Sequence, residues 1–263
     1  MTFKDLGLSE QTIRAIDEMG INRPTTVQND VIPSVLEGKD IFTIAPGRCG
    51  KTCSYVFPLI DIISRKQGQN ILIITADSAQ AVKVSDRLAV FNKYHEFNEQ
   101  ALSESNSEVN NEANVIIAAP DLLLEIAAEN KIDLSSINIL VVDDINLIKK
   151  KHQLTSLEKI LDLLPANKQN IVFTNRRSKE TQDILDKILK TPAEIKVDRT
   201  KEDEASAPEP ADKNKKATEQ AKEKYAAPKT DEEAVALMNR YKNFGSKTPE
   251  FLLLKGELAN SEA

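Results

Sequence analysis

Cysteine, long apolar runs and excess positive charge are all scarce in this sequence of 263 residues. The two cysteines, Cys49 and Cys53, are too few for a disulfide framework, which indicates a reducing compartment. The sequence shows no N-terminal apolar segment typical of a secretion signal, and no apolar run approaches the ~18 residues of a membrane span. We therefore expect a cytoplasmic protein with no membrane partner.

The charge balance argues against a broad nucleic-acid-binding surface. Lysine and arginine number 35 against 41 aspartates and glutamates, for a net charge of −6. This lowers the expectation of RNA binding, although a local patch remains possible. The basic runs Lys149–Lys151 and Arg176–Arg177 have no aromatic platform beside them, so we interpret them as solvated surface. We interpret His95 and His152 as isolated surface histidines.

Apolar runs typical of buried strands alternate with helical patterns along most of the chain. Strands are predicted at 40–45, 70–75, 114–118, 137–143, 170–174 and 193–197, several of them almost continuous Val, Ile and Leu. Helices are predicted between them at 51–66, 78–94, 120–130, 153–163 and 178–189, after two short helices within 9–38. This alternation predicts an α/β fold, a doubly wound parallel sheet in three layers.

The composition changes after the last predicted strand. We predict one globular domain over 1–199. Residues 200–229 are rich in Lys, Glu, Ala, Pro and Asp, which predicts a disordered linker. Residues 230–263 begin with a capping box of Thr230 and Glu233, followed by apolar residues at helical spacing, which predicts a short amphipathic helical tail. The tail either folds back on its own domain or binds a protein or ribonucleoprotein partner.

A phosphate-binding loop is predicted where the first strand meets the following helix. Its residues are Ala45, Pro46, Gly47, Arg48, Cys49, Gly50, Lys51 and Thr52. Such a loop directs backbone N–H groups and the positive end of a helix at phosphate oxygens. Lys51 would bind the β- and γ-phosphates of ATP or ADP, and Thr52 would bind Mg²⁺. Because Ala45 stands where the general pattern has glycine, a relic loop that binds no nucleotide is the alternative.

Two acids, Asp143 and Asp144, end the strand predicted at 137–143. In a phosphate site, Asp143 would hold Mg²⁺ through water, and Asp144 would be the catalytic carboxylate that orients the attacking water. The alternative is that both acids are solvated at the end of a strand.

With these residues placed, the chain resembles the N-terminal, RecA-like domain of the DEAD-box RNA helicases over 1–198. MTFKDLGL at 1–8 and GINRPTTVQ at 20–28 are similar to the Q motif of that family and its upstream aromatic residue. The resemblance implies that Gln28 hydrogen-bonds the adenine edge and that Phe3 stacks on the ring. Without it, Gln28 is an ordinary helix residue and Phe3 fastens its segment to the domain.

The catalytic motifs of this family are altered. Gly47 and Arg48 replace Thr and Gly in the A-x-T-G-S-G-K-T loop, and the SAT motif reads TNR at 174–176. The DEAD tetrad reads DDIN at 143–146, so Asp144 replaces the water-positioning Glu with a shorter arm. A displacement of about 1 Å at such a group can cost on the order of 10²-fold in rate.

The RNA-facing motifs are altered further. The P-T-R-E-L-A motif corresponds to residues 75–80, where Asp77 replaces Arg. The T-P-G-R-L motif corresponds to 119–123, where Asp121 enters and the Arg is lost. The family's Gly-Gly turn is absent from 98–114. Acids at these positions would repel RNA phosphates.

We also expect no second RecA-like domain after residue 199. In the family that domain supplies arginines, and such an arginine is worth roughly 10³–10⁵-fold in rate in other phosphoryl-transfer systems. We therefore expect an ATP-binding, helicase-like accessory or regulatory protein in RNA metabolism, with weakened RNA binding and no stand-alone helicase activity. One alternative is a weak RNA-dependent ATPase completed by a partner in trans, and another is a scaffold that binds no nucleotide.

Overall fold

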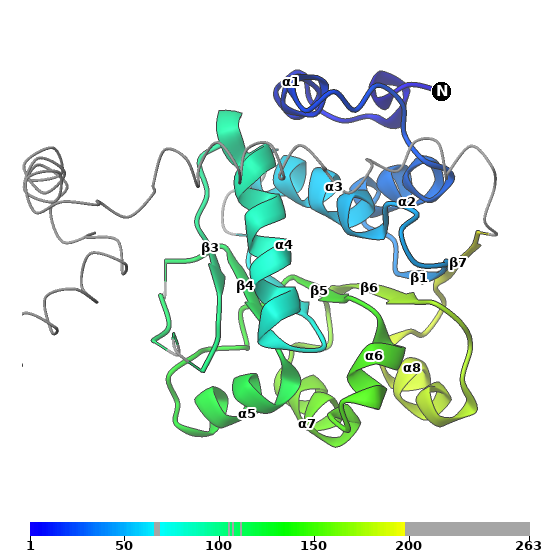
Figure 1. Ribbon diagram of the computed structural model, residues 1–263. Helices are drawn as coiled ribbons and strands as arrows, with labels where there is room; N and C mark the ends of the chain where they lie inside the picture. Colours follow the sequence, from blue (N-terminus) through cyan, green and yellow to red (C-terminus); the bar gives the residue numbers. More distant parts are fainter. Residues whose placement is uncertain (66–68, 105, 107, 111, 198–263) are drawn as a thin grey trace, which may run out of the picture. The chain divides into compact units, whose positions relative to one another are not determined.

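The computed structural model describes residues 1–197 except 66–68, 105, 107 and 111. The predicted linker at 200–229 and the predicted tail at 230–263 lie outside these described residues. The described part is a parallel sheet with helices against both faces (Figure 1). The predicted three-layer α/β fold is therefore confirmed.

The described sheet has seven strands in the order β3-β4-β2-β5-β6-β1-β7, and all neighbours are parallel. The strands are β1 (Ile41–Ile44), β2 (Ile71–Ile74), β3 (Glu99–Ala101), β4 (Val115–Ala118), β5 (Ile139–Val142), β6 (Gln169–Thr174) and β7 (Ala193–Lys196). Because β1 and β2 are separated by β5 and β6, the chain crosses the sheet between its first two strands.

Helices from the first part of the chain cover one face of the sheet, and later helices cover the other (Figure 1). The first group is α1 (Glu10–Glu18), α2 (Thr26–Leu36), α3 (Lys51–Arg65) and α4 (Ser78–Phe91). The second group is α5 (Pro120–Ala128), α6 (Ile145–Lys150), α7 (Leu154–Leu163) and α8 (Gln182–Ile188). Short 3₁₀ helices are η1 (Phe3–Leu6), η2 (Asn92–Tyr94) and η3 (Lys179–Thr181).

Each central strand contributes to two separate apolar cores. Ile71 and Ile73 pack in the core shared with α3, whereas Leu72 and Ile74 pack in the core on the opposite face. Successive side chains of a strand point to opposite faces, so a strand buried on both faces must be apolar throughout. This explains why the central strands could be recognised from uninterrupted Val, Ile and Leu.

The six predicted strands are present within two residues of the expected bounds. The prediction missed β3, because Glu99–Ala101 is short, polar and half-buried at the edge of the sheet. It also missed α6, whose 6 residues are too few for a helical pattern to stand out. Among the helices of the described ranges, none combines the length and apolar content that crossing a membrane requires.

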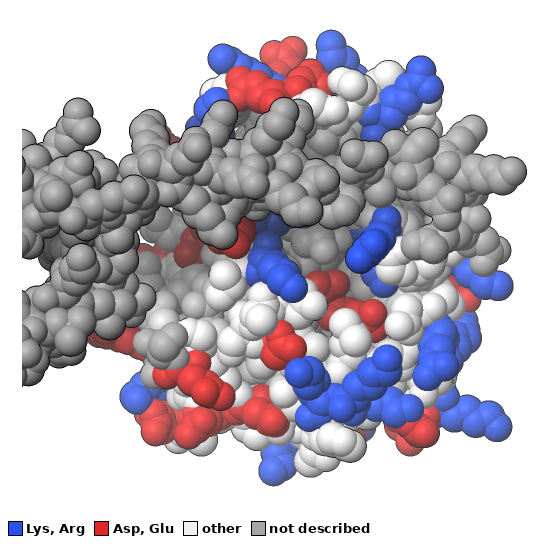
Figure 2. All heavy atoms as spheres, viewed as in Figure 1, with Lys and Arg blue, Asp and Glu red and all other residues white. Residues whose placement is uncertain are grey.

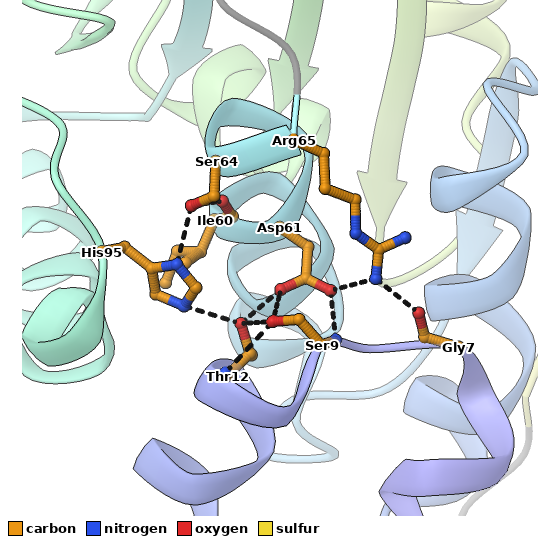
Figure 3. A network of polar contacts seen from close by, with 8 residues as sticks. All are labelled: Gly7, Ser9, Thr12, Ile60, Asp61, Ser64, Arg65 and His95. Atoms are coloured by element: carbon orange, nitrogen blue, oxygen red, sulfur yellow. Dashed lines mark hydrogen bonds and ion pairs between the residues drawn. The ribbon is translucent and has the colours of Figure 1, made fainter.

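A buried carboxylate, Asp61 of α3, fastens the N-terminal segment to the domain (Figure 3). It accepts hydrogen bonds from the backbone N–H of Ser9 at 2.6 Å and the Ser9 hydroxyl at 2.7 Å. The Thr12 hydroxyl also donates to it, as does Arg65 at 3.0 Å. Arg65 in turn donates to the carbonyl of Gly7 at 2.9 Å. Side chains and backbone from both segments thus satisfy one buried anion.

His95 belongs to the same network (Figure 3). Its Nδ1 lies 2.7 Å from Ser64 Oγ, and its Nε2 lies 3.0 Å from Thr12 Oγ1. Burial lowers the pKa of His95, while the nearby Asp61 opposes that shift. The interpretation of His95 as an isolated surface residue was wrong, because its partners come from segments distant in sequence.

We expect Asp61→Asn to lower the free energy of unfolding by about 2–4 kcal/mol, because an amide cannot accept all the donors that converge on Asp61. Urea unfolding at pH 7 measures the change. Asp86→Asn, at an exposed position of α4, is the matched control and should shift stability by no more than about 0.5 kcal/mol. Equal effects of the two substitutions would show that the network adds nothing to stability.

Candidate functional site

The carboxyl ends of β5, β6 and β1 lie side by side, because these strands are parallel neighbours. β1 leads into Ala45 and the predicted loop, after which α3 begins at Lys51. β5 leads into Asp143 and Asp144, and β6 ends at Thr174. The predicted loop and the predicted acids thus meet at the edge where open α/β sheets bind ligands.

The start of α2 supports the loop from behind. Arg48 and Gly50 have left-handed backbones, with φ of 63° and 87°. A Cβ on Gly50 would lie 2.7 Å from Gln28 Nε2 and 3.0 Å from Thr25 Oγ1, so it would displace the Gln28 amide, and the left-handed backbone would strain any side chain there. The Thr25 hydroxyl also donates to the carbonyl of Cys49 at 2.9 Å. The loop conformation therefore depends on glycine at position 50 and on two polar side chains, Thr25 at the N-cap of α2 and Gln28 in its first turn.

Lys51 crosses the inside of the loop. Its Nζ donates to the carbonyl of Ala45 at 3.0 Å and lies 3.8 Å from Asp144 Oδ2. Only 12% of its side chain is exposed. An ammonium group held at the first turn of a helix adds its charge to that of the helix N-terminus, which favours an anion at this point.

Asp143 and Asp144 are in an environment unusual for acids at the end of a strand. The pKa of Asp143 is raised to about 6, chiefly by burial; Lys51 and Tyr55 oppose this rise, and the charge of Asp144 adds to it. Asp144 has a left-handed backbone with φ of 66°. Within the described residues its buried Oδ1 has no hydrogen-bond partner. Strained backbones, orphan polar atoms and raised pKa values are typical of functional sites.

The donor groups suit one kind of metal ion. Within the described ranges, no three His, Cys, Asp or Glu side chains come together as a complete metal site. Mg²⁺ commonly binds one or two protein oxygens and completes its shell with phosphates and water. The half-buried Thr52 and Asp143, with the unpartnered oxygen of Asp144 nearby, fit an ion that arrives with a nucleotide better than a resident structural metal.

Asn146 has a role that its sequence pattern did not reveal. It is buried, and its Nδ2 donates to Thr174 Oγ1 and to the carbonyl of Arg176, both at 2.7 Å. The same group lies 3.1 Å from Asn175 Oδ1. Asn146 therefore joins the segment after β5 to the turn after β6. Only its place in the DDIN tetrad could have suggested this link.

Phe3 and Gln28 are placed differently from the expectation. Phe3 is 3% exposed, and its ring meets Phe57 edge-on with centroids 5.7 Å apart, so it presents no free face for stacking. Gln28 Oε1 accepts from the backbone N–H of Thr25 at 3.0 Å, and Nε2 donates to the carbonyl of Gly50 at 3.4 Å. Both ends of this amide are engaged within the protein, so contact with an adenine would require it to exchange partners.

Of the remaining loop residues, Gly47 and Arg48 are exposed at the tip of the loop, and Cys49 is buried where the chain turns back toward α3. Gly47 and Arg48 are exposed, so the Arg48 guanidinium does not fill the space inside the loop. Cys49 is buried, and its thiol donates to the carbonyl of Pro46 at 3.0 Å. This thiol is a packed part of the loop.

The two acids at the altered RNA-facing motifs lie at the starts of helices. Asp77 caps α4 by accepting from the backbone N–H of Gln80 at 2.9 Å, which lowers the pKa of Asp77, and it pairs with Lys151 at 3.2 Å. Asp121 lies in the first turn of α5. Acidic side chains gather over α5, whereas basic ones gather over α6 and α8 (Figure 2). The face that carries Asp121 is therefore locally acidic.

Known proteins with a similar fold include two archaeal structures. A DEAD box protein from Methanococcus jannaschii superposes with a TM-score of 0.72 at 22% identity, over 75% of this chain and 56% of that one. A hypothetical ATP-dependent RNA helicase from Sulfolobus tokodaii superposes with a TM-score of 0.66 at 23% identity, over 72% of this chain and 57% of that one. These similarities establish that the described domain has the RecA-like fold of those proteins.

Sequence comparison identifies the family. The DEAD-box ATP-dependent RNA helicases RhpA from two strains of Helicobacter pylori are each 26% identical over 202 residues, which cover 74% of this chain and 41% of theirs. The chain thus spans less than half the length of these curated relatives. The family model for the DEAD/DEAH box helicases matches residues 25–184. This match covers more than half of the sequence, and the chain therefore belongs to the DEAD/DEAH box helicase family.

Proposed function

We propose that this chain binds Mg²⁺–ATP or Mg²⁺–ADP and acts as a catalytically impaired accessory or regulatory protein in RNA or ribonucleoprotein metabolism. The observation that carries the proposal is the meeting of Lys51, Asp143 and Asp144 at one edge of the sheet. They lie beside a loop whose left-handed backbone and close contact with Gln28 favour glycine at position 50. A scaffold without a ligand has no need of a lysine that is only 12% exposed and lies 3.8 Å from a buried acid.

The residues of the site divide the binding task. Lys51 would exchange the carbonyl of Ala45 for phosphate oxygens, and the loop N–H groups would bind the same phosphates. Thr52 and Asp143 would hold Mg²⁺, which when bound neutralises phosphate charge. Gln28 supports the loop and reaches adenine only by exchanging its present hydrogen bonds. We leave Phe3 out of the site because its ring is part of the core.

Slow or absent turnover follows from the catalytic carboxylate. Asp144 would be the residue that orients an attacking water, but its arm is one methylene shorter than that of the family's glutamate. The Asp144 carboxylate also lies 3.8 Å from the Lys51 amine, so in the absence of phosphate it faces this lysine of the loop. A carboxylate misplaced by about 1 Å can cost on the order of 10²-fold in rate.

A role near RNA is inferred from the relatives, whose printed names describe RNA helicases. Direct RNA binding by this domain would be weak, because Asp77 and Asp121 put negative charge where the family binds phosphates. We therefore propose a protein or ribonucleoprotein partner, bound through an exposed face or the C-terminal region, as the main point of contact with RNA metabolism.

We expect calorimetric titration of Mg²⁺–ADP and Mg²⁺–ATP into the wild type to give micromolar dissociation constants. Lys51→Ala should weaken binding about 10- to 100-fold, as the loss of one charged hydrogen bond implies. Lys83→Ala, at an exposed position of α4, removes the same charge elsewhere and should leave affinity unchanged. Absence of binding by the wild type, with no thermal stabilisation at millimolar nucleotide, would favour the scaffold alternative.

We expect ATP hydrolysis by the isolated chain to stay within about tenfold of the buffer rate, with or without single-stranded RNA, because Asp144 is short and no partner arginine is supplied. Release of phosphate under steady-state conditions measures this. RNA-stimulated turnover that disappears in Lys51→Ala would instead support the RNA-dependent ATPase alternative.

Asp143 should make the domain less stable at neutral pH. Its pKa is raised from 3.8 to about 6 in the folded chain. The stability given by its protonated form is complete below pH ~3.8 and is lost as the pH rises to about 6. We expect Asp143→Asn to be more stable than the wild type at pH 7.5 by on the order of 1–3 kcal/mol, with most of the difference gone at pH 4.5. Urea unfolding without nucleotide tests this, and an equal difference at both pH values would contradict it.

A further inference from the structure

A hollow of about 550 Å³ lies beside the phosphate loop, at the carboxyl ends of β6, β1 and β7. Ile44 and Ala45 form its wall on the β1 side, Arg176 follows β6, and Lys196 and Val197 come from the end of β7. Of the residues that line the hollow, Ala45 and Pro46 belong to the predicted phosphate loop, and the others lie outside the proposed nucleotide site. The hollow is therefore a separate concavity that shares one wall with it.

Some of the charged side chains around the hollow are paired with an opposite charge, and others are not. Arg177 pairs with Glu194, and its guanidinium lies 5.5 Å from the centroid of the Phe42 ring, so both charges of that pair are already engaged. In the part of the chain that the structure describes, no carboxylate pairs with Arg176 or Lys196. Two exposed cations at the mouth of the hollow thus lack a counter-ion there.

The interior of the hollow is aliphatic. Ile44 and Val197 are 9% and 5% exposed and line it together with Pro46. None of the described residues that line it is aromatic. Single-stranded RNA is usually bound on aromatic rings that stack its bases, and this hollow offers none. An apolar side chain flanked by carboxylates would match both the interior and the two cations.

The turn that presents Arg176 is held rigidly. Its carbonyl accepts hydrogen bonds from Asn146 at 2.7 Å and from the Thr174 hydroxyl at 2.8 Å, and its N–H donates back to that hydroxyl at 3.3 Å. A backbone fixed before binding loses little entropy when a ligand arrives. Because Asn146 follows the two acids of the proposed nucleotide site, this turn is also connected to that site.

We propose that this hollow binds an acidic segment of a partner protein, with an apolar side chain inside and carboxylates on Arg176 and Lys196. The proposal deepens the accessory role proposed above by giving the chemistry of the partner. It rests on that role for its biological meaning, whereas binding at the hollow is testable without nucleotide. The wall shared at Ala45 and the link through Asn146 offer a route by which nucleotide could alter partner affinity.

The test uses the full chain and a short fluorescein-labelled peptide in which glutamate and leucine alternate. Fluorescence anisotropy should show salt-sensitive binding by the wild type. The double substitution Arg176→Ala and Lys196→Ala should weaken it about tenfold or more. A peptide with glutamine in place of glutamate should bind neither protein.

The matched control is Lys83→Ala with Arg87→Ala, which removes one lysine and one arginine from the exposed side of α4. It should retain wild-type affinity, which separates a local site from an effect of net charge. Urea unfolding checks that both double variants are folded, and substitution of Arg176 and Lys196 by Gln provides a second pair if the alanine variant is not. Failure here does not bear on the nucleotide site, which the Lys51→Ala titration decides independently.

The proposal is overturned if the wild type does not bind the acidic peptide, or if the hollow variant and the α4 variant bind it equally. It is also overturned if labelled oligouridine binds more tightly than the peptide and loses affinity in the hollow variant, because the hollow would then be a nucleic-acid site.

Discussion

Parallel pairing of β5, β6 and β1 is the constraint on which the rest of the domain depends. It brings together three strand ends that are far apart in sequence, and with them Lys51, Asp143 and Thr174. The pairing is stable because these strands are apolar on both faces and are covered by helices on each side. Without that sheet, the loop and the acids would have no fixed relation. The hollow beside them depends on the same strand ends.

The strands of the sheet and the position of the loop between a strand and a helix could be predicted, because both depend on short local patterns in the sequence. Continuous Val, Ile and Leu identify strands buried on two faces, and a loop ending in Gly50, Lys51 and Thr52 between a strand and a helix is the pattern that predicts a phosphate-binding loop. The hydrogen bonds that were not predicted join residues that are far apart in the sequence. Apart from its place in the DDIN tetrad, nothing near Asn146 in sequence indicates that it hydrogen-bonds the turn after β6, and nothing near His95 indicates its contacts with Thr12 and Ser64.

At least one departure from the family pattern has a local structural use. Asp77 removes a cation from an RNA-facing motif, yet it caps α4 and pairs with Lys151. An N-cap of this kind is worth ~1 kcal/mol. This acid therefore contributes to the stability of the fold independently of any contact with RNA. Asp143 and Asp144 are the opposite case, because burial raises the pKa of Asp143 and a buried oxygen of Asp144 has no hydrogen-bond partner among the described residues, and neither feature stabilises the fold.

The network around Asp61 shows that the folded domain extends beyond the residues that match the family model. The family match begins at residue 25, but the groups that satisfy Asp61 include Ser9 and Thr12. A shortened chain starting at the family boundary would leave a buried carboxylate short of donors and remove Phe3 from the ring of Phe57. The first residues are therefore a structural part of the domain. A truncated version of the chain should keep them if the domain is to fold.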